Sequence, residues 1–364
     1  AIDRTSVHRL TSGQVVVDLQ TAGASPSPSV AWRESSSPLS SSSPNAVKEL
    51  VENALDAGAT SVDITFRDAG VESIEVKDNG KGIDQGDWEG IALKHHTSKL
   101  ASFADLAAVA TLGFRGEALS SLCGVANLSM VTSTASTAPM GTSLAFAHSG
   151  ACTPLKKVAR ERGTTVKVER LFDRLPVRRK ELVKNAQREL AKALALVQAY
   201  ALVNVGVRFE ARNVTKGCTL VQLKTTASTS LRTAFSYLFS PKDLPSLLDL
   251  DLTFDVTTEK SVMKLDGPTR SATTIHVKGL ISKPSTGHGR TSGNRQFFYI
   301  NGRPFQPAKV AKAVNEVYKS FNANQFPCIV ADFQLAPDAY DVNVSPDKRT
   351  IFLHSEGNLI AALK

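Results

Sequence analysis

The spacing of apolar residues in the first part of the chain predicts a helix followed by a β-hairpin. Between residues 47 and 55, apolar side chains recur at positions i, i+3, i+4, i+7 and i+8, which is typical of a helix with one face on the core. Asn45 can cap the start of this helix, and Gly58 can end it. Alternating apolar residues at 62–66 and 74–76 then flank turn residues 68–70, as expected of two antiparallel strands.

The rest of the pattern mixes strands and helices, which predicts an α+β or α/β fold. Further strands are expected near residues 125–131, 143–147, 163–168, 207–211, 220–223, 273–281, 296–300 and 329–335, and helices near 178–196, 231–238 and 307–321. Because a single core rarely grows past about 250–300 residues, we divide the 364 residues into domains 1–204 and 205–364. Residues 24–44 are rich in Ser and Pro, and we interpret them as a flexible insertion.

The first predicted helix carries a second, polar face. At about 100° per residue, Glu49, Asn53 and Asp56 lie together on that face. Most amphipathic helices have a solvated polar face of this kind. The alternative is a carboxylate and an amide directed into a pocket, but the helix alone favours the solvated face.

Glycines follow the second strand of the predicted hairpin and recur before a later helix. Gly80 and Gly82 come directly after Asp78, where they form either an ordinary turn or a close backbone approach to a ligand. Their spacing is not that of a dinucleotide-binding G-x-G-x-x-G motif, and the chain has no P-loop motif. In the run 113–119, two glycines bracket a helix start and can form a phosphate cradle or a tight loop.

Composition narrows the class of protein. Hydrophobic residues make up 42% and charged residues 21%, which is typical of a globular chain. The four cysteines form no C-x-x-C pair, which argues against a disulfide scaffold or zinc knuckle and favours a reducing compartment. The most apolar stretch, 193–207, is shorter than the ~20 residues that a membrane span needs, so no membrane association is expected. The chain does not begin with Met, and we interpret it as part of a longer protein.

Positive charge is concentrated in two stretches. The formal net charge is +9, and residues 267–315 hold eight basic residues and no acidic one. A positive field without carboxylates suits the phosphate backbone of duplex DNA. The residues that we assign to DNA contact are Lys278, Lys283, Arg290, Arg295, Arg303, Lys309 and Lys312. A second excess, 13 basic against 5 acidic residues at 156–192, is either a solvated face or a further DNA contact.

Taken together, the short motifs resemble the MutL mismatch-repair family. They are ELVENALDAG at 49–58, DNGKG at 78–82, TSK at 97–99, GFRGEAL at 113–119, GT at 163–164 and DVNVSPDK at 341–348. The runs LKHHTSK at 93–99, LPVRRK at 175–180 and QFFYING at 296–302 are most similar to the eukaryotic PMS-type subunit. The match covers nearly the whole chain. One departure is the insertion at 24–44, because related sequences run almost directly into the helix that holds Glu49.

This resemblance implies a GHKL (Bergerat) ATPase domain, an α/β sandwich, followed by a domain like ribosomal protein S5 domain 2. It implies that Glu49 is the general base, that Asn53 is the Mg²⁺ ligand, and that Asp78 accepts from the adenine amino group. Lys348 would come from the second domain and sense the γ-phosphate. The remaining nucleotide-binding residues that it implies are Asp56, Gly80, Gly82, Thr97, Ser98, Lys99, Gly113, Phe114, Arg115, Gly116, Glu117, Ala118, Leu119 and Thr164.

The function implied by the resemblance is slow, Mg²⁺-dependent ATP hydrolysis that drives a nucleotide-gated DNA clamp in mismatch repair. The implied partners are double-stranded DNA, an MLH-type heterodimer subunit and MutS homologues, and the implied location is the nucleus. The chain ends at Lys364 without an Asp-Gln-His-type metal motif, so we expect no nuclease activity from it. Two alternatives are a DNA-binding scaffold with a vestigial ATP site, and another GHKL ATPase such as an Hsp90-like chaperone or a type II topoisomerase subunit.

Overall fold

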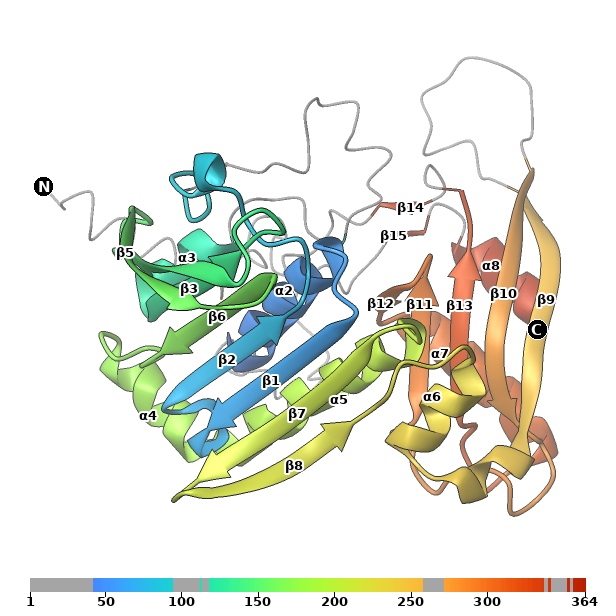
Figure 1. Cartoon of the computed structure of the whole chain (residues 1–364). Coiled ribbons are helices and arrows are strands. Elements are labelled where there is room, and N and C mark those ends of the chain that lie inside the picture. Colours follow the sequence, from blue (N-terminus) through green and yellow to red (C-terminus); the bar gives the residue numbers. More distant parts are fainter. Residues whose placement is uncertain are drawn as a thin grey trace, which may run out of the picture. The chain divides into compact units, whose positions relative to one another are not determined.

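The computed structural model describes residues 42–93, 112, 118–257, 272–336, 340–341, 352–353 and 356–364, and it forms two compact units, each built around its own sheet (Figure 1). Within the described residues, the first unit contains 42–93, 112, 118–201 and 205–227, and the second contains 202–204 and 228 onward. We had expected the second domain to begin at residue 205. Residues 208–224 instead extend the first sheet, so the continuous chain of the second unit begins later, at Ser228.

The first unit contains an eight-stranded sheet. Its order is β5-β4-β3-β6-β2-β1-β7-β8. The strands are β1 (Ser61–Arg67), β2 (Ser73–Asp78), β3 (Asn127–Ser133), β4 (Met140–Phe146), β5 (Cys152–Ala159), β6 (Gly163–Glu169), β7 (Arg208–Thr215) and β8 (Cys218–Lys224). The β1–β7 pair is parallel and the other neighbouring pairs are antiparallel. The hairpin predicted at 62–76 is therefore confirmed, and β5 is a strand that the sequence pattern did not predict.

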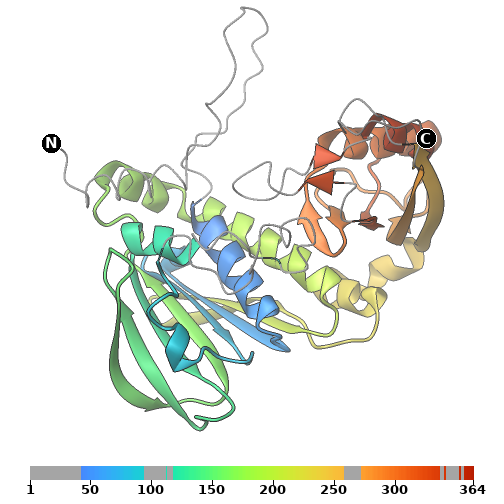
Figure 2. The same ribbon diagram turned by 90° about the horizontal axis from the view of Figure 1, so that it is seen from above.

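Four helices cover one face of this sheet, which makes the unit a two-layer α/β sandwich (Figure 2). They are α2 (Ser42–Asp56), α3 (Ala118–Val125), α4 (Pro176–Lys184) and α5 (Ala186–Val203). The alternation along β1 explains the layering, because Val62, Ile64 and Phe66 are buried while the residues between them are half-exposed. Within the described helices, none is long and apolar enough to span a membrane.

Helix α2 confirms the predicted amphipathic helix but begins earlier than expected. Val47, Leu50 and Val51 on its apolar face are buried. The helix begins at Ser42, so Asn45 lies inside it and does not cap it, and the last residues of the predicted flexible insertion form its first turn. Proline is tolerated in a first turn, where its missing N–H is not needed. Past its end, Gly58 takes a positive φ of 71°.

The second unit contains a five-stranded sheet of order β12-β11-β13-β10-β9, in which β11 and β13 are parallel. The strands are β9 (Leu247–Thr257), β10 (Ala272–Ser282), β11 (Gln296–Ile300), β12 (Arg303–Phe305) and β13 (Ile329–Gln334). A two-stranded sheet, β14 (Tyr340–Asp341) and β15 (Phe352–Leu353), and helices α6 (Leu231–Leu238), α7 (Ala308–Phe321) and α8 (Glu356–Leu363) complete it. The strand β9 was not predicted.

Two clusters of buried side chains stabilise the second unit. Val310 of α7 and Leu359 of α8 pack into one cluster together with apolar residues of the sheet. Phe235 of α6 and Leu202, at the end of α5, belong to the other cluster. The unit is thus an α/β domain, and its specific likeness to ribosomal protein S5 domain 2 stays a prediction.

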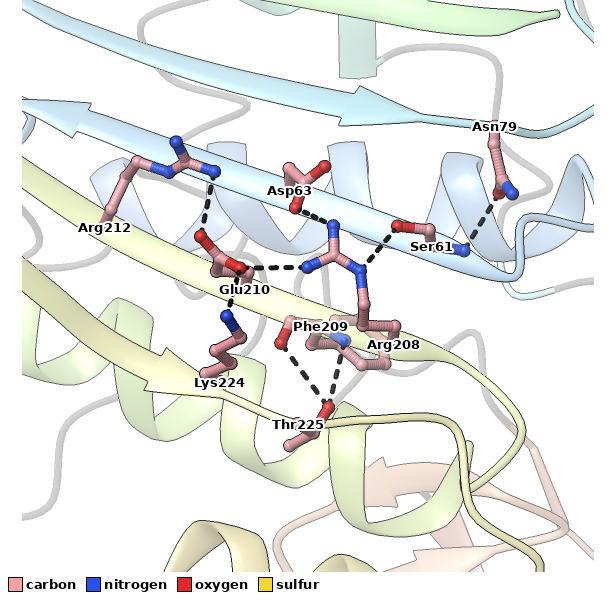
Figure 3. Close-up of polar contacts among 9 residues, drawn as sticks. All are labelled: Ser61, Asp63, Asn79, Arg208, Phe209, Glu210, Arg212, Lys224 and Thr225. Atoms are coloured by element: carbon pink, nitrogen blue, oxygen red, sulfur yellow. Dashed lines mark hydrogen bonds and ion pairs between the residues drawn. The ribbon is translucent and has the colours of Figure 1, made fainter.

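A polar network on the uncovered face of the first sheet joins β7 and β8 to β1 (Figure 3). Arg208 forms an ion pair with Asp63 at 2.5 Å and with Glu210 at 2.9 Å. Burial opposes ionisation of Glu210, but the surrounding cations, Arg212 and Lys224 first among them, lower its pKa below the ordinary value. These contacts explain why the β7–β8 hairpin belongs to the first unit.

Candidate functional site

The polar face of α2 supplies an amide and two carboxylates. Glu49, Asn53 and Asp56 are all half-buried, because the opposite face of the helix packs into the core. The Glu49 side chain is 22% exposed, and Lys48 Nζ lies 3.0 Å from its Oε1. The backbone N–H of Leu112 donates to Asp56 Oδ1 at 2.9 Å, which brings Leu112 to this end of the helix.

Asp78 is a buried carboxylate at the end of β2. It is 7% exposed, and its Oδ1 accepts from the backbone N–H groups of Gly80 at 2.8 Å and Thr164 at 3.1 Å. Burial raises the pKa of Asp78 above the ordinary value, while the two amide donors act in the opposite direction. Both of these hydrogen bonds reach the same oxygen, so one edge of the carboxylate is fixed by the protein and the other can meet a ligand.

Gly80 and Gly82 allow close backbone approaches within the protein, and the approach of this turn to a ligand stays a prediction. A Cβ on Gly80 would lie 2.8 Å from Ala57 Cβ, just past the end of α2. Gly82 has a φ of 76°, and a Cβ there would lie 2.2 Å from the Ser133 carbonyl oxygen. Side chains at either position would separate the turn after Asp78 from α2 and β3. The glycines therefore bring the turn after Asp78 against the end of α2 and against β3.

Hydroxyl and guanidinium groups support this turn. The buried Oγ1 atoms of Thr132 and Thr164 lie 3.2 Å apart, and Thr132 Oγ1 accepts from the backbone N–H of Ile83 at 2.9 Å. Arg160 donates through Nη2 to the carbonyl oxygen of Asp78 at 2.8 Å. Neither Thr132 nor Arg160 was predicted from the sequence. A signal existed for Thr132, because it is a polar residue at an inward-facing position of β3.

The structure thus gathers several predicted residues and leaves others undescribed. Asp56, Asp78, Gly80, Gly82 and Thr164 come together at the end of α2, and Ala118 and Leu119 begin α3, which packs against α2. The predicted residues Thr97, Ser98, Lys99, Gly113, Phe114, Arg115, Gly116, Glu117 and Lys348 lie outside the described residues. Across the described ranges, no three His, Cys, Asp or Glu side chains gather as a metal-binding group.

The residues predicted to contact DNA do not form one free cationic surface. Arg303 is buried, and Arg295 forms an ion pair with Asp243 at 2.5 Å and lies over the ring of Phe239. Neither guanidinium group is freely exposed, and their contact with DNA stays a prediction. Lys309 and Lys312 lie 2.7 Å and 4.0 Å from acidic residues of the same unit.

The three other predicted residues differ from one another. Lys278 pairs in register with Asp251 on one neighbouring strand and with Asp332 on the other. Lys283 and Arg290 are half-exposed and form no ion pair among the described residues. Lys278 is exposed and likewise forms no ion pair among the described residues, although two carboxylates flank it on the neighbouring strands. Lys283 and Arg290 keep the free charge that contact with a phosphate requires.

A different set of cations lies just before α4, on α4 itself and at the start of α5. Arg174, Lys180, Lys184 and Arg188 are exposed and form no ion pair within the described part of the chain. Their neighbour Arg179 instead donates to the carbonyl oxygens of Val71 and Leu171. We call the four exposed residues the α4 cations.

Comparisons with known proteins first define the class to which this fold and site belong. Residues 41–155 match the family of histidine kinase-, DNA gyrase B- and HSP90-like ATPases, which is the GHKL class. A solved ATPase domain of Aquifex aeolicus MutL, complexed with ADP, is 25% identical with a TM-score of 0.54 and covers 81% of this chain and 92% of its own. The predicted GHKL fold is confirmed.

Longer relatives then define the family. Saccharomyces cerevisiae DNA mismatch repair protein PMS1 and human mismatch repair endonuclease PMS2 are each 42% identical over the whole of this chain. A solved N-terminal domain of a DNA repair protein is 40% identical, with a TM-score of 0.78 and coverage of 98% of this chain and 94% of its own. Residues 253–364 match the C-terminal domain model of DNA mismatch repair proteins. The chain belongs to the MutL family of mismatch-repair proteins and is of the PMS1/PMS2 type. It spans 39% of the length of the two curated relatives.

Proposed function

We propose that the first unit binds ATP with Mg²⁺ and hydrolyses it slowly, and that this cycle drives a nucleotide-gated clamp on DNA during mismatch repair. The observation that carries the proposal is the buried Asp78 carboxylate, which is fixed through one oxygen in a turn that packs against the end of α2. A buried carboxylate with one oxygen left for a ligand is well suited to bind a specific donor group.

The residues around Asp78 fit an adenine base. An adenine amino group donates to the carboxylate, whereas the 6-oxo group of guanine is an acceptor and would face another acceptor. Gly80 and Gly82 keep this wall thin, since neither carries a side chain. Thr164 closes the same side of the pocket, held by its backbone donation to Asp78 and its contact with Thr132.

The polar face of α2 fits the phosphate end of the nucleotide. Glu49 acts as the general base, which requires its carboxylate to lie about 2.6–3.2 Å from the attacking water. Asn53, one helical turn further on, supplies a neutral oxygen to Mg²⁺, which when bound neutralises developing phosphate charge. Lys99, the 113–119 run and Lys348 complete the phosphate contacts in this proposal, together with Asp56, Thr97 and Ser98.

Replacing Asn53 with alanine should weaken Mg²⁺-dependent ATP binding by about ten-fold or more, because the metal loses its ligand from the protein. The measurement is a Mg²⁺ titration of ATP affinity. Asn127→Ala is the matched control, since Asn127 is exposed on β3 in the same unit. An unchanged Mg²⁺ dependence in Asn53→Ala would contradict the ligand assignment.

The proposed assembly follows from the family. We infer an MLH-type heterodimer partner, action together with MutS homologues, and a nuclear location. A vestigial ATP site and another GHKL activity are the competing proposals. Single-turnover hydrolysis of ATP by this chain separates the first of them from ours, and the presence of chaperone or topoisomerase activity would favour the second.

We further propose that the chain contacts the DNA backbone through the α4 cations, supported by Lys283 and Arg290. Four exposed cations without internal partners give a positive field that carboxylates do not cancel. Such contacts supply affinity without reading the base sequence. We therefore expect binding of duplex DNA with no preference for a mismatch.

Reversing the charge of Lys180 and Lys184 together should reduce the slope of log DNA affinity against log salt by about two, since each lost phosphate contact removes about 0.9 from the slope. The measurement is duplex binding across a salt series. Lys224→Glu is the control, because Lys224 lies on the uncovered face of the first sheet, near Glu210. If the slope changes only with Lys283→Glu and Arg290→Glu, the α4 cations are not the contact surface.

A further inference from the structure

A buried lysine lies beside the proposed general base. Lys48 is 3% exposed, although lysine side chains are almost never fully buried without a partner. Its Nζ lies 3.0 Å from Glu49 Oε1 and 3.0 Å from Glu52 Oε1. The ammonium group thus connects a carboxylate at the candidate site to one deep in the core.

The second carboxylate is itself held in place from another helix. Glu52 is 1% exposed, and its Oε1 accepts from the Tyr200 hydroxyl at 2.5 Å. Tyr200 lies on α5 and is fully buried. A lysine fixed by a buried carboxylate and tyrosine has little rotational freedom, so its position beside Glu49 is set by packing between α2 and α5.

We propose that Lys48 is a positioning residue for hydrolysis, which holds the Glu49 carboxylate in place and keeps it ionised. This inference rests on the proposed ATPase function, and it adds Lys48 as the residue that positions the general base Glu49. A carboxylate in a partly buried site becomes harder to ionise, and a second carboxylate nearby has the same effect. The Lys48 cation offsets both, while Glu52 draws part of its charge away from Glu49.

Within the described part of the chain, Lys48 is a cation in direct contact with Glu49. On α2 the neighbouring charges are Lys48 and Glu52, and α5 contributes the Tyr200 hydroxyl. The helix α3, which packs against α2, has Cys123 as its one titratable residue. On β2, Glu75 and Lys77 point to the opposite face of the sheet, and Asp78 is engaged by Gly80 and Thr164.

The test is the pH dependence of kcat for ATP hydrolysis by the whole chain, in variants that change the charge beside Glu49. In Lys48→Met, the acidic limb of the pH–rate profile should move to higher pH, because the Glu49 carboxylate loses a neighbouring positive charge that favours its ionised form. Lys48→Arg should restore most of the original profile. Glu52→Gln should move the limb to lower pH, since the full charge of Lys48 then acts on Glu49.

A double variant and a matched single variant serve as controls for an effect on folding. Lys48→Met/Glu52→Gln leaves no unpaired charge in the core and should still show the upward shift. Lys192→Met removes the cation from buried Glu189 on α5, an ion pair of similar length at 2.9 Å, and should leave the limb in place. The ATP affinity of each variant, measured separately, shows that its site is intact.

The outcomes separate the two levels of the proposal. Absence of turnover by the unmodified chain would contradict the ATPase function itself and this inference with it. Turnover with an unmoved acidic limb in Lys48→Met and in the double variant would leave the ATPase function standing and overturn the role of Lys48. A lower kcat without a shift indicates a structural lysine only.

Discussion

Replacing Glu49 with alanine should lower ATP turnover by about 10²- to 10⁴-fold, the usual contribution of a general base, while nucleotide affinity stays nearly unchanged. The side chain lies on the polar face of α2 and is partly exposed, so its removal leaves the apolar face of that helix intact. The base acts on the attacking water and not on the bound nucleotide. Turnover and binding should therefore separate cleanly in this variant.

The measurement for Glu49→Ala pairs single-turnover hydrolysis with an independent binding assay. Glu75→Ala is the control, because Glu75 is a half-buried carboxylate of the same unit on the opposite face of the sheet. It should hydrolyse ATP at the unmodified rate. Loss of binding in Glu49→Ala together with loss of turnover would show that Glu49 supports the fold or the ligand, which would contradict its assignment as the base.

Replacing Asp78 with asparagine should lower ATP affinity by about 10²-fold or more, because the site then presents an amide donor to the donating amino group of adenine. The asparagine oxygen can still accept from the backbone amides of Gly80 and Thr164, which keeps the turn in place. Inosine triphosphate carries an oxygen where ATP carries that amino group. Its affinity relative to ATP should therefore rise in Asp78→Asn.

Competitive binding of ATP and inosine triphosphate measures this change in relative affinity. Asp84→Asn, at an exposed position further along the chain, is the control.

The pH dependence of ATP binding follows from the raised pKa of Asp78. As the pH falls through that pKa, the carboxylate gains a proton and ATP affinity should fall, beginning above the ordinary value of 3.8. Asp78→Asn should lack this step. An equal loss of affinity for both nucleotides, or a pH step that persists in Asp78→Asn, would assign the adenine contact to another residue.

Hydrophobic periodicity predicted the elements that have one clear buried face. The helix at 47–55, the hairpin at 62–76 and the helix at 231–238 all lie where the pattern places them. The pattern missed β5, whose residues are nearly all exposed at the edge of the sheet, so that no buried alternation marks them. It also missed β9, the edge strand of the second sheet.

The distribution of charge along the sequence predicted the charged surface less well than hydrophobic periodicity predicted the helices and strands. The acid-free stretch at 267–315 suggested a continuous cationic surface, but Arg295 pairs with Asp243, which lies outside that stretch, and Arg303 is buried. Partners distant in sequence cancel a charge that looks free along the chain. The α4 cations keep theirs because no acidic side chain of the described residues reaches them.

The sequence by itself determined the family, the amphipathic helix and the individual motifs, because these depend on residue type and on spacing within a single element. Only the tertiary structure decided which motifs meet. The bond between Asp78 and Thr164 spans 86 residues, and that between Glu52 and Tyr200 spans 148. Such contacts arise when strands and helices pack into a shared core, and the packing fixes which polar groups lose water and must bind one another. The burial of Lys48 and the fixed edge of Asp78 are therefore properties of the fold and not of any local run of residues.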